Sequence, residues 1–376
     1  MHSLKPAVLL LVTALLGSCG GGGHGAPPPP ASQFVYASTY SVPGANGFLP
    51  TGIYAFAAGA GLSQVSGSPF SPTLSGPIAF SRDARFLYTA DGTGSLPLLA
   101  AFSIGSDGSL SPVSGSPFTI PAALTILVAN PTSDFLYGLG DSGELLVFAI
   151  DSASGTATLR SSVVASAEAA AVTPNGRFLY LVSGQAGGAQ LAGFAVDPDT
   201  GALSPLPGPL TTAVMQPGSV VIEAAGKYLY LADTLSIQTI HACCVTGFAI
   251  DANTGALTQL ADSPFNLGGT VSALVASGGF LLAVIAPSGA SACTLSVISV
   301  DPAVGTLASV PDSPVGQLCG SLGVDPSLPY VYDLVGYESQ SGGTLLAFYL
   351  DHTGALTLIE TARVPAPTMG MVAVMH

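Results

Sequence analysis

Short apolar runs that each begin with an aromatic residue recur along most of the chain. Their third residues are separated by 52, 49, 43, 50, 52 and 50 positions, a mean near 49. These runs are too short for helices, and a regular period of this size is typical of repeated β-sheet units. The seven runs are Phe34-Val35-Tyr36, Phe86-Leu87-Tyr88, Phe135-Leu136-Tyr137, Phe178-Leu179-Tyr180, Tyr228-Leu229-Tyr230, Phe280-Leu281-Leu282 and Tyr330-Val331-Tyr332.

A second apolar strand is predicted after each aromatic strand, followed by a tight turn. These second strands are expected at 53–56, 99–104, 146–150, 191–196, 245–250, 295–300 and 346–350. Residues 197–203 have the sequence Asp-Pro-Asp-Thr-Gly-Ala-Leu, and related segments occur at 251–257, 301–307 and 351–356. The aspartate can cap the turn and the glycine supplies a positive φ, which predicts β-hairpins. A calcium site is the alternative, but one carboxylate per turn is fewer than calcium prefers.

Four short strands per period predict an all-β fold, a seven-bladed β-propeller of four-stranded blades. Ser-Pro-Phe at 68–70, 116–118 and 263–265, with Ser-Pro-Val at 313–315, would mark the passage to the next blade. Every aromatic strand except the first follows an apolar strand, such as 78–81 or 170–173, that would line a central channel. The missing strand occurs at the other end, at 371–375. We therefore expect the N- and C-terminal strands to pair and close the ring, which removes an open sheet edge. A β-sandwich array gives no reason for this complementarity.

Composition limits the class of protein. Of 376 residues, 48% are hydrophobic, whereas 7 are Lys or Arg and 21 are Asp or Glu. This balance excludes a disordered chain and also excludes a nucleic-acid binder, which needs a basic patch.

The N-terminus predicts secretion and a lipid anchor. A ten-residue apolar run at 7–16 is too short to span a bilayer, and residues 1–18 have the form of a signal peptide. Leu16-Gly17-Ser18-Cys19 resembles the bacterial lipobox, in which the cysteine becomes the lipidated first residue. An ordinary cleaved signal with a chance cysteine is the alternative. We expect a glycine- and proline-rich tether at 19–33 and the propeller at 34–376.

The anchor would hold the mature chain through lipid rather than charge. Without Lys5 the mature chain has 6 basic and 21 acidic residues, a formal charge of −15 that repels anionic lipid. The predicted location is the bacterial cell envelope, periplasmic or surface-exposed.

The repeats at 79–88 and 172–180, with the Asp…Thr-Gly-Ala-Leu hairpins, resemble a known family. It is the lactonase-like propeller family of the 6-phosphogluconolactonase and carboxymuconate-cyclase type. The resemblance covers about 34–376 and implies the seven-bladed fold. It does not fix the activity, because propellers host many unrelated functions.

The chain departs from the pattern of the active enzymes of this family. Their Arg-His pair before an inner strand is absent from all seven slots, and their Asn-Glu pair is replaced, as at Asp91-Gly92 and Asp233-Thr234. Lactone opening needs a base for water and a donor or cation for the oxyanion. The slots hold Gly76-Pro77, Thr125-Ile126, Glu168-Ala169, Gly218-Ser219, Thr270-Val271, Gly320-Ser321 and Gly370-Met371.

Glu168 and His241 are the remaining candidate catalytic residues. Glu168 occupies a slot that faces the predicted channel, and His241 precedes the third strand of its blade. A solvated carboxylate and an exposed loop histidine are the ordinary explanations for both. The chain has no nucleophile elbow, phosphate loop or haem attachment motif, so we expect no cofactor.

Four cysteines besides Cys19 suggest an oxidising compartment. Cys243, Cys244, Cys293 and Cys319 are predicted to lie on one side of the ring. We favour a Cys293–Cys319 disulfide and a vicinal Cys243–Cys244 bridge, although three pairings are possible. A metal site built from His241 with Cys243, Cys244 and Cys293 is an alternative, but adjacent cysteines seldom reach one tetrahedral centre, so no metal is expected.

Two classes of function follow from these observations. The first is a lipid-anchored, monomeric propeller that binds a small molecule or protein on the cysteine-bearing face. The second is a lactone hydrolase or cycloisomerase with a remodelled site. The chain has no Trp, so carbohydrate stacking would depend on tyrosines such as Tyr40 or Tyr337.

Overall fold

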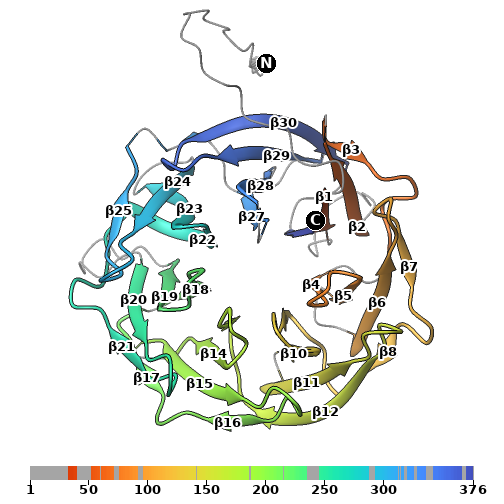
Figure 1. The fold of residues 1–376 in the computed structure, drawn as a ribbon, viewed down its shortest axis with the longest axis horizontal. Coiled ribbons are helices and arrows are strands. Elements are labelled where there is room, and N and C mark those ends of the chain that lie inside the picture. Colours follow the sequence, from red (N-terminus) through yellow and green to blue (C-terminus); the bar gives the residue numbers. More distant parts are fainter. Residues whose placement is uncertain are drawn as a thin grey trace, which may run out of the picture.

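The structure is a ring of seven antiparallel sheets, shown in Figure 1 around one central axis. This computed structural model describes residues 33–39, 52–59, 61–71, 76–91, 96–140, 142–185, 188–214, 216–234, 245–287, 293–311, 313, 315–316, 320–325, 328–335, 342–365 and 370–375. The seven-bladed propeller predicted from the repeats is confirmed. No helix that could cross a membrane occurs in these ranges.

Each blade is named here by its strands, from the innermost outward. Blade 1 contains β31 (Gly370–Met375), β1 (Gln33–Thr39), β2 (Gly52–Ala58) and β3 (Ser63–Gln64). Blade 2 contains β4 (Ile78–Phe80), β5 (Phe86–Ala90), β6 (Leu98–Ile104) and β7 (Leu110–Pro112), with β8 (Phe118–Thr119) beside β6. Blade 3 contains β9 (Ile126–Ala129), β10 (Phe135–Leu139), β11 (Glu144–Ile150) and β12 (Ala157–Val164).

The other four blades follow the same plan. Blade 4 contains β13 (Ala169–Val172), β14 (Phe178–Ser183), β15 (Gln190–Val196) and β16 (Leu203–Pro205), with β17 (Leu210–Thr211) beside β15. Blade 5 contains β18 (Pro217–Ile222), β19 (Tyr228–Asp233), β20 (Val245–Ile250) and β21 (Leu257–Gln259). Blade 6 contains β22 (Gly269–Ser277), β23 (Phe280–Pro287), β24 (Thr294–Val300) and β25 (Leu307–Ser309), with β26 (Val315–Gly316) beside β24. Blade 7 contains β27 (Gly320–Val324), β28 (Tyr330–Val335), β29 (Gly343–Leu350) and β30 (Leu356–Val364).

The ring closes in blade 1, where the two ends of the chain pair. β31 lies antiparallel to β1, with Phe34 opposite Met375 and Thr39 opposite Gly370. The predicted pairing of terminal strands is therefore confirmed. A buried polar cluster supports the seam beside it: the Tyr332 hydroxyl donates to Gln33 Oε1 at 2.8 Å, and the Gln33 amide donates to Asp325.

Seven hydrophobic clusters fill the spaces between neighbouring blades, one for each interface. The aromatic strands supply much of each cluster because alternate side chains of a second strand point to the two neighbouring blades. The residue at their third position is a fully buried tyrosine in six blades and Leu282 in blade 6. Burial of these strands on both faces explains why they are apolar runs rather than alternating ones.

A glycine in the hairpin of one blade packs against the aromatic strand of the blade before it. Gly255 of blade 5 has φ +71°, and a Cβ on it would lie 2.5 Å from Cδ1 of Phe178 in blade 4. The Tyr180 hydroxyl donates to the Gly255 carbonyl at 2.7 Å. The same hydrogen bond joins Tyr36 to Gly108, Tyr88 to Gly155 and Tyr230 to Gly305. The glycine is thus required both by the turn and by the ring that packs against it.

The predicted turns are also present. In the hairpin that begins at Asp197, the Asp197 carboxylate accepts the Thr200 N–H at 2.8 Å, and the 251, 301 and 351 hairpins repeat this use of aspartate. Ser68, Ser116 and Ser263 of the Ser-Pro-Phe segments each accept an N–H from the third strand of the blade.

The outer edges of the blades differ more than the repeats predict. Three blades gain a two-residue fifth strand that pairs with the third strand. In blades 3 and 7 the fourth strands, β12 and β30, have 8 and 9 residues, whereas the other fourth strands have at most 3. Each long strand pairs with its neighbour through a bulge. The sequence predicts the aromatic strands well because they are buried on both sides, while these edges face solvent.

Candidate functional site

The ring has two faces of different character. We call the face with the hairpins after the third strands, such as those at Asp197 and Asp251, the hairpin face. We call the opposite face, where the inner strands begin and the second strands end, the mouth face. The slots of the lactonase-like pattern all lie on the mouth face, which is therefore the candidate functional site.

Glu168 lies on the mouth face, immediately before the inner strand β13, as the sequence predicts. Its side chain is exposed and accepts the Gly184 N–H at 3.3 Å. A carboxylate here can act as a base or attract a cation.

Asp91 and Asp233 occupy equivalent places at the ends of β5 and β19. Both are buried; Asp91 accepts the Leu96 N–H at 2.9 Å and Asp233 accepts the Gln216 N–H at 3.2 Å. Their bonds to loop backbone give them a role in shaping the loops. The described residues contain no group of three His, Cys, Asp or Glu that could hold a metal ion.

Cationic side chains lie elsewhere in the part of the chain that the structure describes. On the hairpin face Arg82 Nε forms an ion pair with Asp134 at 2.6 Å, Arg177 donates to the Ala252 carbonyl at 2.9 Å, and Arg85 donates to Ser152. Lys227 lies within 3.5 Å of the Pro302 carbonyl on the same face. The remaining two, Arg160 and Arg363, are on the outermost strands β12 and β30. Hence no described cation lies beside Glu168 to stabilise an oxyanion.

Several predicted site residues fall outside the described residues. They are Cys19, Tyr40, His241, Cys243, Cys244, Cys319 and Tyr337. Cys293 is described, half-buried just before β24 at the interface of blades 6 and 7. Its pairing with Cys319 and the role of His241 stay predictions.

The structure adds one residue that the repeats do not single out. Asp333 lies in the middle of β28 and is 0% exposed, and neither carboxyl oxygen has a hydrogen-bond partner among the described residues. Burial raises the pKa of Asp333 to about 7. The signal was present in the sequence, because the equivalent places in the other aromatic strands hold Ala37, Thr89, Gly138, Leu181, Leu231 and Ala283.

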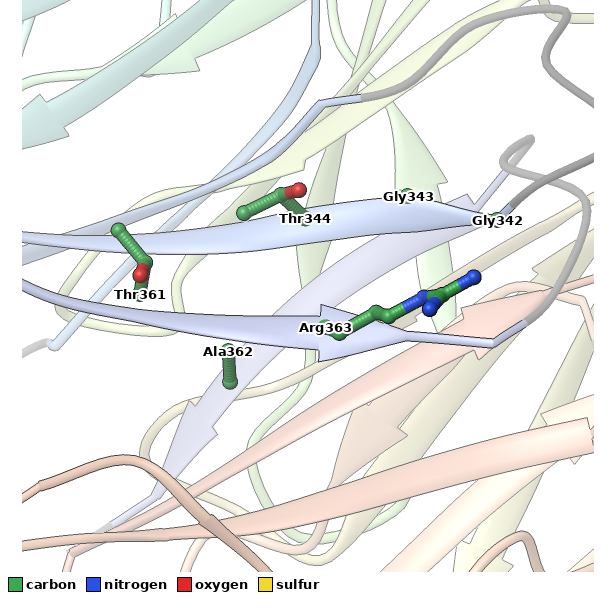
Figure 2. Close-up of a pocket in the computed structure, with 6 residues that line it drawn as sticks. All are labelled: Gly342, Gly343, Thr344, Thr361, Ala362 and Arg363. Atoms are coloured by element: carbon green, nitrogen blue, oxygen red, sulfur yellow. The ribbon is translucent and has the colours of Figure 1, made fainter. Parts of the chain in front are cut away.

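A hollow of about 410 Å³ lies at the outer rim of the mouth face in blade 7. Figure 2 shows the residues of β29 and β30 that line it. The Arg363 side chain extends along the sheet toward Gly342, and Thr344 and Thr361 lie on the other side of Arg363. Two glycines, Gly342 and Gly343, leave that end of the hollow without side chains.

Comparison with known proteins supports the fold and leaves the activity open. No protein-family model matches the chain, and no curated protein matches it. A Bacteroides fragilis protein provisionally named a 6-phosphogluconolactonase has 18% identity and a TM-score of 0.69, covering 92% of this chain and 98% of its own. The Pseudomonas aeruginosa periplasmic gluconolactonase has 19% identity and a TM-score of 0.63, covering 91% and 99%. Kuenenia stuttgartiensis hydrazine synthase has 14% identity and a TM-score of 0.52, covering 77% and 81%. These proteins share the propeller architecture while their names point to different chemistry.

Proposed function

We propose that this chain is a binding or interaction propeller, anchored outside the cytoplasmic membrane by lipid on Cys19, which presents its mouth face to a ligand or partner. The observation that carries the proposal is the distribution of charge. Glu168 is exposed at the mouth face in blade 4, while the described cations lie on the hairpin face, on β12 or, for Arg363, at the outer rim of the mouth face in blade 7. A carboxylate without a neighbouring cation can bind a ligand but lacks the charged partner that would stabilise a developing oxyanion.

The charge also indicates the class of partner. The chain carries a formal charge of −14, of which Glu168 is an exposed carboxylate on the mouth face, while Asp91 and Asp233 are buried at the same end of their strands. A negative surface raises the association rate of cationic partners and disfavours anionic ones. We therefore propose a partner with a positively charged segment.

A lactone hydrolase or cycloisomerase is the second candidate. Its support is the fold, since two structures with lactonase names cover nearly the whole chain. Glu168 would then act as the base, and the oxyanion donor would have to come from backbone N–H groups of the mouth-face loops.

An enzymatic assay separates the two candidates. The purified protein is incubated with gluconolactone, 6-phosphogluconolactone and an aryl lactone, beside the Glu168→Gln variant. The binding proposal expects hydrolysis at the buffer rate from both proteins. Hydrolysis above buffer that Glu168→Gln abolishes overturns the proposal and establishes the lactonase.

A binding assay tests the partner class. Spermidine serves as a cationic probe in calorimetry at low and high salt, with gluconate as the anionic control. We expect salt-sensitive binding of spermidine that weakens several-fold in Glu168→Gln, and no binding of gluconate at this site. Equal binding by both proteins removes Glu168 from the site.

The anchor has its own test. The similarity to a protein named a periplasmic gluconolactonase supports an extracytoplasmic location. Cells expressing the full chain should incorporate labelled palmitate, and Cys19→Ala should abolish the label and release the protein from membranes. A Cys19→Ala protein that stays membrane-bound contradicts the anchor.

A further inference from the structure

Asp333 faces the interface between blades 6 and 7. In β28, Tyr330, Tyr332 and Leu334 belong to the cluster shared with blade 1, whereas Val331 belongs to the cluster shared with blade 6. Side chains alternate along a strand, so Asp333 points the same way as Val331. Within its own sheet it lies between Leu322 of β27 and Leu346 of β29.

Among the described residues, the elements packed against this carboxyl present apolar side chains to the interface. Blade 6 presents Val284 of β23 and Leu295 and Val297 of β24 to the interface. β22, β23, β24 and β27 contain no Asp, Glu, His, Lys or Arg, and Cys293, which lies just before β24 in the same cluster, is disulfide-bonded and does not titrate. On the same face of blade 7, Arg363 is the charged residue of β30, two strands outward, with Leu346 between that strand and Asp333.

Space beside the carboxyl is provided by Gly320 at the start of β27. A Cβ on Gly320 would overlap the Asp333 carboxylate and would also lie 2.5 Å from the Leu334 carbonyl oxygen, so both the acid and the neighbouring strand need glycine at this position. An ionised carboxylate in such a site loses its hydration without gaining a partner, which is far costlier than burying the neutral acid. The acid therefore fits this interface in its protonated form.

We propose that Asp333 makes the interface of blades 6 and 7 a proton-sensitive joint, closed while the carboxyl is neutral and opened at its mouth-face end when the carboxyl ionises. Asp333 lies two residues before the mouth-face end of β28, and its carboxylate lies beside Gly320. Admission of water there would release the start of β27 and the start of β24. The mouth face would thus change shape in blades 6 and 7 while the rest of the ring holds.

The pH dependence has a definite sign. Burial raises the pKa of Asp333 from 3.8 in the unfolded chain to about 7. Stability from the neutral acid is therefore complete below pH 3.8 and is lost as the pH rises through about 7. Between these two pKa values the unfolding equilibrium constant rises about tenfold for each step of one in pH. It should therefore rise about a hundredfold between about pH 5 and 8 from this group alone.

The test compares urea unfolding of the full chain, Asp333→Asn and Asp199→Asn at several values between pH 5 and 8. Asn is close in shape to the neutral acid, and Asp199 lies exposed in a hairpin turn. The wild type and Asp199→Asn should lose stability together as the pH rises, while Asp333→Asn should not show the hundredfold change. Parallel pH profiles for all three proteins overturn the proposal.

A second measurement uses only the wild-type protein. Hydrogen exchange of the wild type, corrected for the intrinsic effect of pH, should show protection lost above pH 7 in β27, β28 and the start of β24, with β14 and β19 unchanged. The infrared band of a protonated carboxylic acid should be present at pH 6 and disappear above pH 8. Uniform protection across the ring, or absence of that band at pH 6, contradicts the joint.

Discussion

The hairpin face and the mouth face are built from the same seven repeats but satisfy their polar groups differently. On the hairpin face the Asp197 carboxylate holds its own turn, Arg177 binds the next hairpin, and Tyr180 bonds to the carbonyl of Gly255. On the mouth face Glu168 is exposed and Asp333 is buried without a partner among the described residues. The contrast teaches that the hairpin face uses its charged groups to hold the blades together, whereas the mouth face leaves Glu168 open to solvent.

The largest expected loss in the free energy of unfolding comes from a substitution on the hairpin face. Gly255→Ala adds a Cβ in a left-handed conformation at 2.5 Å from the Phe178 ring, and it should lower the free energy of unfolding by about 4 kcal/mol. Gly208→Ala is the matched control, because Gly208 also has positive φ, +53°, but no atom within 4 Å of its added Cβ. It should cost only about 1 kcal/mol for the backbone. Urea unfolding measures both, and equal costs would show that the aromatic contact is unimportant.

The next largest loss of stability is expected from removing the predicted Cys293–Cys319 disulfide on the mouth face. A Cys293–Cys319 bridge would join blade 6 to blade 7, and its removal by Cys319→Ser should cost roughly 3.5 kcal/mol, less any strain. Cys243→Ser is the control and should leave this link intact. Non-reducing peptide mapping with urea unfolding checks the pairing. A large loss in Cys243→Ser with none in Cys319→Ser would reverse the assignment.

How far the sequence predicts the molecule differs between the two faces. The aromatic strands and the closure at β31 were predictable because residues buried on both sides must recur in every blade. The hairpins at Gly105 and Asp151 were missed, since they depart from the Asp-Pro-Asp-Thr-Gly form, although their turns fold alike. The fifth strands and the long β12 and β30 were missed because solvent-facing edges carry a weak pattern.

The candidate site was only partly predictable. The repeat period predicts where Glu168 lies. It does not predict that Asp333 is buried without a hydrogen-bond partner among the described residues. Its isolation depends on which side chains blade 6 presents across the interface, and that information is spread over three strands distant in the sequence. A lone acid in an apolar run was visible, but its partners or their absence required the packing.

A smaller effect tests the hydrogen bonds that link the blades. Tyr180→Phe removes the hydroxyl that donates to Gly255 at 2.7 Å, leaves a buried carbonyl unpaired, and should cost about 1 kcal/mol. Tyr349→Phe is the control, since the Tyr349 side chain is half-buried on β29 and forms no side-chain hydrogen bond within the described residues. Thermal unfolding should distinguish them by about 1.5 °C in Tm, because a domain of this size has an unfolding entropy of about 0.7 kcal/mol/K. Equal Tm values would mean that packing of the rings alone holds the blades together.

The smallest expected loss of stability concerns the Asp251 carboxylate on the hairpin face, whose response to acid should be opposite to that of Asp333. The Asp251 carboxylate accepts the Thr254 N–H at 2.8 Å and the Thr254 hydroxyl at 2.9 Å, and these bonds lower its pKa from 3.8. Its stabilising effect is therefore present above pH 3.8 and is lost as the pH falls below that value. Asp251→Asn should be slightly less stable than wild type at pH 6 and equal to it in strong acid, because the amide retains the acceptor but not the charge.

Asp199→Asn is again the control, because its carboxylate accepts no hydrogen bond in the described part of the chain, and it should match wild type at both pH values. If Asp251→Asn matches wild type at pH 6, the hairpin carboxylates do not contribute through charge. A fall in stability with rising pH has the opposite sign to the effect of the Asp251 carboxylate, so it would be assigned to Asp333 whatever this variant shows.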